Sequence, residues 1–307
     1  MDPTRGIALK LASVFLFTLM AACVKAAREV VPPGEVIFFR SLLAIPPIII
    51  YALWLGRLHE AFRVNDRFAH LNRGLVGVAS MGFSFAALGL LPLPEVIAIS
   101  YAAPLIATAL AALMLGEQVR AFRWTAVVAG LVGVLIMIWP RLTLLTSGEI
   151  SSGEALGAWF AILSAMLVGL VTIHIRKLTR TETTLSIVFW FAVISTVAAL
   201  TTIPFGWVWP GGMTLVFLVA SGLLGGTAQI LMTESYRAAD ASTLAPMEYS
   251  SMVYGLGIGY LFFAEFPDWP VLVGASIVIA SGLIILHRER RLGRDLARER
   301  ASKTPQG

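Results

Sequence analysis

Glu248 and Arg40 are the ionisable residues whose positions along the chain most favour a chemical role. Each lies inside a long apolar run, and a charge in lipid costs about 2.5–3.5 kcal/mol on insertion scales, so such residues are functional candidates by default. Glu248 could bind a proton or pair with a substrate amine; its alternative is a neutral acid hydrogen-bonded to a neighbouring helix. Arg40 either snorkels toward the lipid surface or faces the interior and holds a carboxylate through a two-pronged contact.

Two lysines and five neutral residues form a second group of candidates. Lys25 lies near the end of its apolar run, where snorkelling accounts for it unless it contributes to a site, and Lys10 is expected to be an interfacial anchor. Neutral side chains at mid-depth could line a cavity and bind a small solute: Tyr101, Thr108, Gln229, Trp190 and Tyr254. The alternative for each is packing between helices or a place at the lipid–water interface.

The elements that must position these residues are long apolar segments. Of the 307 residues, 58% are apolar and 13% are charged, whereas soluble domains average about 45–50% and about 25%. A bilayer span needs about 20 apolar residues, and the chain has ten such runs: 6–27, 35–55, 74–91, 95–115, 124–139, 155–174, 185–204, 212–233, 242–263 and 268–287. Because the runs are continuous rather than alternating, they predict an all-α integral membrane protein with ten transmembrane helices.

The basic residues predict the orientation of the chain, because Lys and Arg are retained on the cytoplasmic side. If the N-terminus is cytoplasmic, most of the 23 basic residues, Arg73 among them, fall in cytoplasmic segments, and only Arg28 and Arg141 fall in outer ones. Both termini are therefore expected in the cytoplasm. The basic tail 288–307 directly follows an apolar run, which favours contact with the lipid surface over binding to nucleic acid.

The two halves of the chain carry similar landmarks in the same order, which indicates an internal repeat. The landmarks are Glu117, Trp124 and Gly133 in the first half and Glu265, Trp269 and Gly282 in the second. Five helices per half is an odd number, so the second half must enter the membrane from the opposite side, as in many secondary transporters. We expect two inverted five-helix repeats, at 6–139 and 155–287, followed by the tail 288–307.

These features resemble the EamA-type branch of the drug/metabolite transporter superfamily. The resemblance rests on Arg40, on Leu115-Gly116-Glu117-Gln118 after the fourth run, on Gly130 and Gly133, and on Glu265 and Gly282. It departs from the family at Ala264-Glu265-Phe266-Pro267, which replaces the usual Gly-Glu pair. The resemblance implies ten helices in two inverted halves, an inner-membrane location, and movement of small metabolites by alternating access, such as amino-acid-like solutes or vitamins such as riboflavin.

Several chemistries have no signature in the sequence. There is no P-loop, no metal-binding spacing among the four histidines, and a single cysteine, Cys23, so we expect no cofactor and no primary pump. The expected function is secondary transport of a small-molecule solute, with protons as a candidate coupling ion, and no enzyme activity. Two alternatives remain at this point: an integral membrane enzyme acting on lipid-linked substrates, and a non-transporting membrane subunit.

Overall fold

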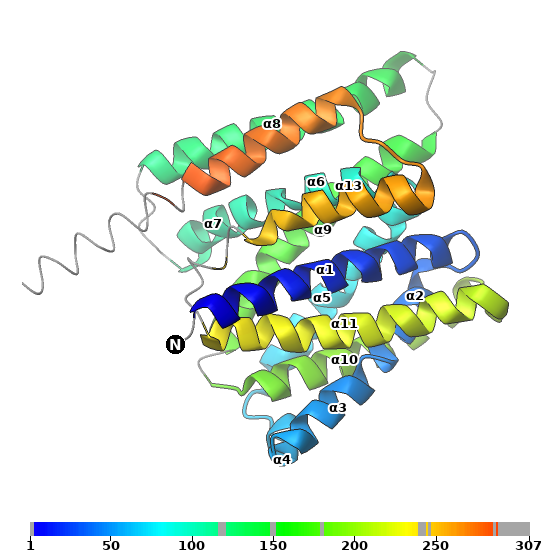
Figure 1. Cartoon of the computed structure of the whole chain (residues 1–307), viewed down its shortest axis with the longest axis vertical. Coiled ribbons are helices and arrows are strands. Elements are labelled where there is room, and N and C mark those ends of the chain that lie inside the picture. The colour runs from blue at the N-terminus through cyan, green and yellow to red at the C-terminus, as the bar shows by residue number, and fades with distance from the viewer. Residues whose placement is uncertain are drawn as a thin grey trace, which may run out of the picture.

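The computed structural model describes residues 3–115, 121–147, 152–178, 181–238, 244, 247–284 and 287. Within these residues the chain is helical and contains no strand. The helices are α1 (Pro3–Arg28), α2 (Pro33–Leu42), α3 (Ile45–Trp54), α4 (Leu58–Phe62), α5 (Arg67–Leu88), α6 (Leu93–Ser100), α7 (Ala102–Leu115), α8 (Ala121–Ser147), α9 (Ser152–Leu178), α10 (Thr184–Leu200), α11 (Gly212–Ala238), α13 (Ser250–Phe263) and an unlabelled helix over Trp269–Ile284 (Figure 1). Of the sequence landmarks, Gly116, Glu117, Gln118 and the tail 288–307 lie outside the described residues.

Many of these helices are apolar enough to lie in lipid. Five are also long enough to cross a membrane: Thr4–Arg28, Pro33–Trp54 (α2 with α3), Arg67–Leu88, Gly153–Ile175 and Gly212–Ser235. Shorter apolar helices cover Leu93–Ala107, Val128–Met137, Thr184–Leu200, Ser250–Phe263 and Trp269–Ile284. The prediction of a helical membrane protein is confirmed, whereas the count of ten spans and the inverted repeat remain predictions.

The boundaries differ from the sequence prediction where prolines interrupt the helical hydrogen bonds. The second run breaks between α2 and α3 at Leu43, because Pro46 and Pro47 lack the N–H groups that would continue the ladder. The fourth run breaks at Tyr101, between α6 and α7. The helix that contains the fifth run is longer than the run itself, since α8 has 27 residues and contains Pro140, but its apolar part, Val128–Met137, is short.

Helices from the two predicted halves are interleaved. α1 lies along α11, α5 lies along α9, and α10 packs against both α2 and α5 (Figure 1). The α11 contact needs glycine, because a Cβ at Gly226 would lie 2.8 Å from the carbonyl oxygen of Ala44 in the bend between α2 and α3. The bend is therefore held against α11 at close range, and this fixes the direction of α2.

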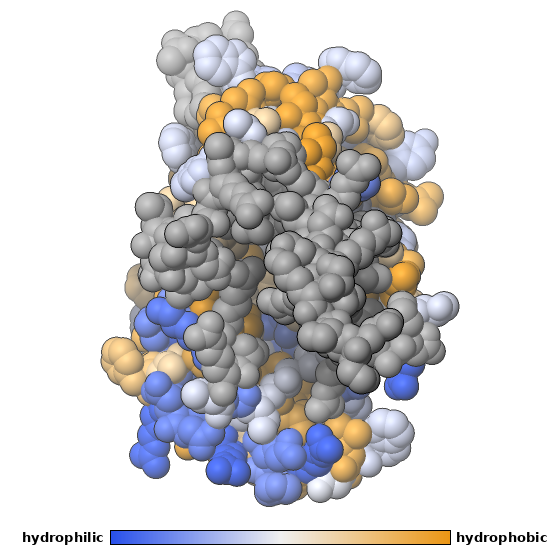
Figure 2. All heavy atoms as spheres, turned by 90° about the vertical axis from the view of Figure 1, so that its left-hand side faces the viewer, coloured by the Kyte–Doolittle hydropathy of each residue, from blue (hydrophilic) through white to orange (hydrophobic). Residues whose placement is uncertain are grey.

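The outer surface is apolar along the helices and polar at one end of the bundle. Exposed large apolar side chains include Trp54, Leu53, Val197, Val216 and Leu261, as expected for residues in contact with acyl chains. Figure 2 looks onto the end of the bundle where the N-terminus lies, and its hydrophilic residues gather in the lower part, at the height of α3 and α4 in Figure 1. Charged residues thus gather around α4, at one end of the bundle.

Candidate functional site

Buried polar atoms without a hydrogen-bond partner are concentrated on four helices: α2, α5, α9 and α10. Among the described residues these atoms are Arg40 Nε, Ser41 Oγ, His70 Nε2, Arg73 Nε and Nη1, His174 Nδ1, Trp190 Nε1 and Ser195 Oγ. Buried polar groups almost always have a partner, so each exception calls for an explanation such as a bound ion, water or ligand. The concentration on neighbouring helices indicates one polar region inside the bundle.

Arg40 of α2 and Arg73 of α5 meet at the centre of this region, on the ring of Phe191 in α10. The guanidinium carbon of Arg73 lies 3.7 Å from the ring centroid, and that of Arg40 lies 6.0 Å from it. Arg40 is 8% exposed and Arg73 is 6% exposed, and in the described part of the chain no carboxylate pairs with either. Arg40 therefore does not snorkel to the surface.

Arg73 lies deeper in the protein than the sequence predicts. It was expected in a cytoplasmic segment, but α5 begins at Arg67 and carries Arg73 inside the bundle. Gly77, one turn later on the same face, explains the close approach of α10, because a Cβ there would lie 2.6 Å from Cε2 of Phe191. The sequence signal that could have identified it is an arginine directly before an apolar run with a glycine four residues later.

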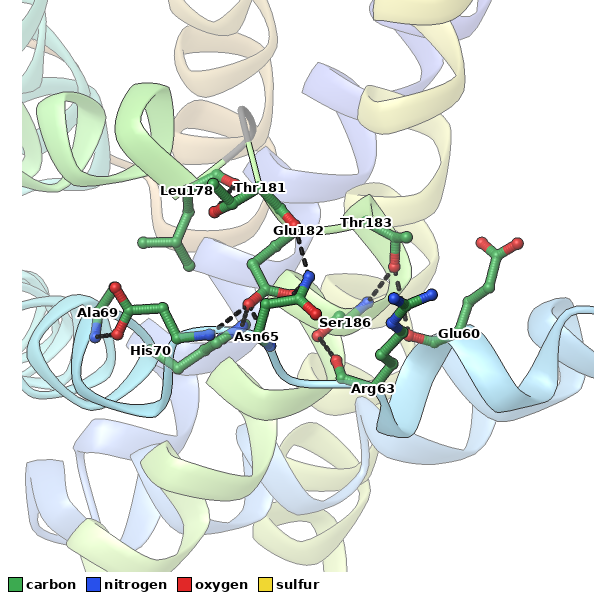
Figure 3. Close-up of polar contacts among 11 residues, drawn as sticks. Glu60, Arg63, Asn65, Ala69, His70, Leu178, Thr181, Glu182, Thr183 and Ser186 are labelled. Carbon is green, nitrogen blue, oxygen red and sulfur yellow. Dashed lines mark hydrogen bonds and ion pairs between the residues drawn. The ribbon is translucent and has the colours of Figure 1, made fainter.

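A network of hydrogen bonds joins the loop before α10 to the start of α5 (Figure 3). Glu182, between α9 and α10, accepts hydrogen bonds from the backbone N–H groups of Asn65 (2.6 Å) and Asp66 (2.8 Å) at the start of α5. Nε2 of His70 lies 3.5 Å from the same carboxylate oxygen, within ion-pair range but longer than a hydrogen bond. The loop before α10 is thereby fixed to the start of α5.

Two hydroxyl groups extend this network to α4 (Figure 3). The Thr183 side chain caps α10 by accepting from the Ser186 N–H (3.3 Å), and it donates to the Glu60 carbonyl (3.2 Å). The Ser186 hydroxyl donates to the Arg63 carbonyl (2.5 Å). The connections α4–α5 and α9–α10, which belong to different predicted halves, are therefore joined by several hydrogen bonds.

Glu248 lies apart from the arginines, paired with Lys10 of α1. Lys10 is 1% exposed and the Glu248 side chain is 47% exposed. The prediction that Lys10 is an interfacial anchor is therefore wrong: it lies inside the bundle, where an ion pair offsets the cost of burying its charge. Glu248 thus has a basic partner within the protein.

Tyr101 lies against α13 and the residue just before it, and Tyr254 belongs to α13 itself. The Tyr101 hydroxyl is 2.6 Å from the Ser251 hydroxyl and donates to the Tyr249 carbonyl at 3.3 Å. The Tyr254 ring meets the ring of Phe15 of α1 edge-on, with 5.3 Å between centroids. Both rings therefore join α13 to neighbouring helices.

Lys25 forms the second ion pair of α1. Its ammonium lies 2.8 Å from Glu265 and donates to the Leu91 carbonyl at 2.8 Å. The other Glu265 oxygen accepts from the Leu93 N–H at 2.9 Å. The two lysines of α1 are thus paired with two glutamates that flank α13, at opposite ends of α1.

The remaining predicted residues lie elsewhere. Gln229 lines a cavity of about 300 Å³ between α3, α4, α10 and α11, together with Tyr51, Thr233 and Glu234. Trp190 lines a hollow of about 550 Å³ that also contains His70. Thr108 belongs to α7, and its side chain lies outside what the structure describes. The predicted residues therefore do not form one cluster.

Comparison with known proteins gives a consistent picture. A family model described as the EamA-like transporter family matches residues 4–139 and 155–287. The chain is 27% identical over 257 residues to an S-adenosylmethionine uptake transporter of Rickettsia prowazekii (strain Madrid E), covering 84% of each chain. It is 28% identical over 288 residues to the pseudopaline exporter CntI of Pseudomonas aeruginosa (strain UCBPP-PA14), covering 93% of this chain and 97% of that one.

Two further matches agree with these. A riboflavin transporter of Rhizobium johnstonii is 29% identical over 254 residues, which cover 82% of this chain and 79% of the relative. A solved crystal structure shares the fold, with a TM-score of 0.66 at 19% identity, over 94% of this chain and 99% of that one. The matched proteins are transporters and not enzymes, and the apolar helices agree with a multi-pass membrane protein. The chain is therefore a small-molecule transporter that belongs to the EamA-like transporter family.

Proposed function

We propose that this protein is a secondary transporter that moves a small polar or amphipathic metabolite across a bacterial inner membrane by alternating access. The observation that carries the proposal is the set of unpartnered buried polar atoms around Arg40, in a chain of a transporter family. The relatives named for S-adenosylmethionine, pseudopaline and riboflavin differ in cargo and direction. They support an amino-acid-like or aromatic, vitamin-like solute as the cargo class.

The proposed mechanism is the rocking of two inverted five-helix halves, with both termini in the cytoplasm. Contacts that join the halves support it: Lys25 with Glu265, Lys10 with Glu248, and Glu182 with the start of α5. Lys10 and Lys25 lie 15 residues apart on α1, about 22 Å along the helix axis. Opening toward one side would require breaking the contacts at that end while those at the other end hold.

The individual roles are proposals as well. Arg40 would contact the cargo directly, and Glu248 would bind a proton or a substrate amine in exchange for its contact with Lys10. The cavity beside Gln229 offers a vestibule at the α4 end of the bundle. Other side chains that we propose as contacts for the transported solute are Tyr101, Tyr254, Trp190, Thr108 and Lys25.

The test is flux through the purified chain in proteoliposomes. S-adenosylmethionine, riboflavin and aromatic amino acids would be offered one at a time, with and without an imposed pH gradient, and protein-free liposomes would serve as controls. We expect saturable uptake of at least one solute above that control. Dependence on the pH gradient would identify protons as the coupling ion. Absence of flux for every solute, with the chain folded and inserted, would contradict the proposal.

A further inference from the structure

We infer that Arg40 and Arg73 together form a binding site for an anionic group, a carboxylate or phosphate carried by the solute, with Phe191 as the flat surface beside it. The inference rests on the proposed transport function and specifies its substrate class. It adds Arg73 and Phe191, which the sequence did not single out, to Arg40. It also makes a negative charge, rather than general polarity, the property that the site selects.

The first step is the missing counter-charge. An ionised group buried without a partner is strongly destabilising, and arginine stays protonated in proteins. Arg40 and Arg73 are both more than nine-tenths buried, and each charge repels the other. Lys10 is buried to a similar extent, but it has an acidic partner, Glu248. An anion bound between the two guanidinium groups would supply the charge that the described side chains do not.

The second step is the geometry of the donors. Nε of Arg40 and Nε and Nη1 of Arg73 are buried and make no hydrogen bond. A guanidinium group presents parallel N–H donors that match the two oxygens of a carboxylate or phosphate. Stacking of Arg73 on the Phe191 ring fixes the plane of that fork. Two such forks beside one ring can bind an anion between them.

The third step is the position of the pair within the bundle. Arg40 lies seven residues into α2 and Arg73 six residues into α5, about 9–11 Å from the start of each helix. These starts are at opposite ends of the bundle, because α2 and α3 cross it between them. The site is therefore near mid-depth, where both sides can reach it in turn. Ser195, one turn beyond Phe191 on α10, adds a buried hydroxyl without a partner.

A matched pair of small probes tests the assignment without knowledge of the cargo. Benzoate and benzamide share a planar ring, but only benzoate carries the carboxylate. The thermal unfolding midpoint of the purified full chain would be measured in detergent with each probe at equal ionic strength. We expect benzoate to raise the midpoint by about 2–4 °C at saturation and benzamide to leave it unchanged. Equal shifts with both probes would overturn the inference.

Variants assign the effect to the two arginines. Arg40→Gln and Arg73→Gln should each abolish the benzoate shift, whereas Arg63→Gln should retain it, because Arg63 is exposed and has no ion pair among the described residues. If a glutamine variant does not fold, Arg73→Lys keeps the charge without the fork, and at least a tenfold higher benzoate concentration should be needed for the same shift. A benzoate shift that persists unchanged in the variants of both arginines would overturn the assignment.

The anion could also come from a lipid headgroup. Adding lipids to the same unfolding measurement distinguishes a lipid anion from an anion carried by the solute. Phosphatidylglycerol added to the detergent should leave the benzoate shift intact, as should phosphatidylcholine. If phosphatidylglycerol alone removes it, the site binds lipid and the assignment to the solute fails. The two proposals can fail separately. An arginine-dependent benzoate shift without any flux would support the anion site but not transport. Flux of neutral solutes without a benzoate shift would support transport but not the anion site.

Discussion

The ammonium group of Lys10 pairs with the carboxylate of Glu248, 238 positions later in the sequence. Lys10 is almost fully buried, whereas Glu248 keeps about half of its side chain accessible. The charge of Lys10 therefore needs its partner more than the charge of Glu248 does, because water can solvate the half-exposed carboxylate but not the buried ammonium. A solute or proton that reaches Glu248 would have to compete with this pair, so the pair ties binding at Glu248 to the contact between α1 and the residues just before α13.

Replacement of Glu248 by glutamine should impair both stability and transport. Removing one partner of a buried ion pair costs about 3–5 kcal/mol, and the cost here should be smaller because Glu248 is 47% exposed. Initial flux should fall by about tenfold, equivalent to ~1.4 kcal/mol. Thermal unfolding and uptake in proteoliposomes would be measured for Glu248→Gln and for Lys10→Met/Glu248→Gln. The double variant should unfold at a higher temperature than the single variant, because it leaves no buried lysine charge without its glutamate. Unchanged flux in Glu248→Gln would show that this residue is not part of the transport site.

Weakening the Lys25–Glu265 pair should open the end of the bundle where α1 ends. Glu265→Gln keeps an acceptor for the Leu93 N–H but loses an ion pair whose side chains are 13% and 20% exposed. The cost should lie between about 1 kcal/mol for an exposed pair and about 3–5 kcal/mol for a buried one. The only cysteine in the sequence, Cys23, lies two residues before Lys25 and serves as a native reporter. Its rate of alkylation by a water-soluble maleimide should rise several-fold in Glu265→Gln. Glu29→Gln, which alters an exposed residue nearby, should leave the rate unchanged.

The cap of α10 should contribute measurably to folding. Thr183→Ala removes the acceptor for the Ser186 N–H and the donor to the Glu60 carbonyl, and loss of such a cap costs about 0.5–2 kcal/mol. Thr201→Ala, at the other end of the same helix, removes only a hydrogen bond to the Ala198 carbonyl and is the matched control. The unfolding midpoint should fall clearly for Thr183→Ala and little for Thr201→Ala. Equal midpoints for the two would mean that the α4–α10 contacts are not retained in the folded membrane protein.

Topology labelling tests the count of spans. Single cysteines at residues 65, 177 and 300, introduced in a Cys23→Ser background, should react with an impermeant reagent only from the cytoplasmic side. A cysteine at residue 147 should react only from the opposite side. Labelling of residue 300 from the outer side would break the ten-span arrangement and, with it, the inverted repeat.

The sequence predicted the helices well, because an apolar run of this length has few other structures open to it in lipid. It predicted their ends less well. The apolar run at 74–91 begins after Arg73, whereas α5 begins already at Arg67. The helix therefore carries His70 and Arg73 inward, where neighbours that are distant in sequence surround them.

The candidate site was predictable only in part for the same reason. Arg40 was identified with its two alternatives, and its burial excludes snorkelling. The partners of the lysines could not be predicted, because Glu248 and Glu265 are far away in the sequence from Lys10 and Lys25, and only the packing of α1 against α13 brings them together. Residue type and depth predict which charges need a partner; they do not predict which partner is within reach.

The packing of α1 along α11 has a consequence for biosynthesis. Synthesis proceeds at about 5–20 residues per second, and α11 begins only at Gly212, so the first helix waits for roughly ten to forty seconds before its main neighbour leaves the ribosome. During that time Glu248, which pairs with Lys10 in the folded chain, has not yet been synthesised. The nascent chain must therefore shelter this helix, through the insertion machinery or the lipid headgroups, until the second half arrives to enclose it.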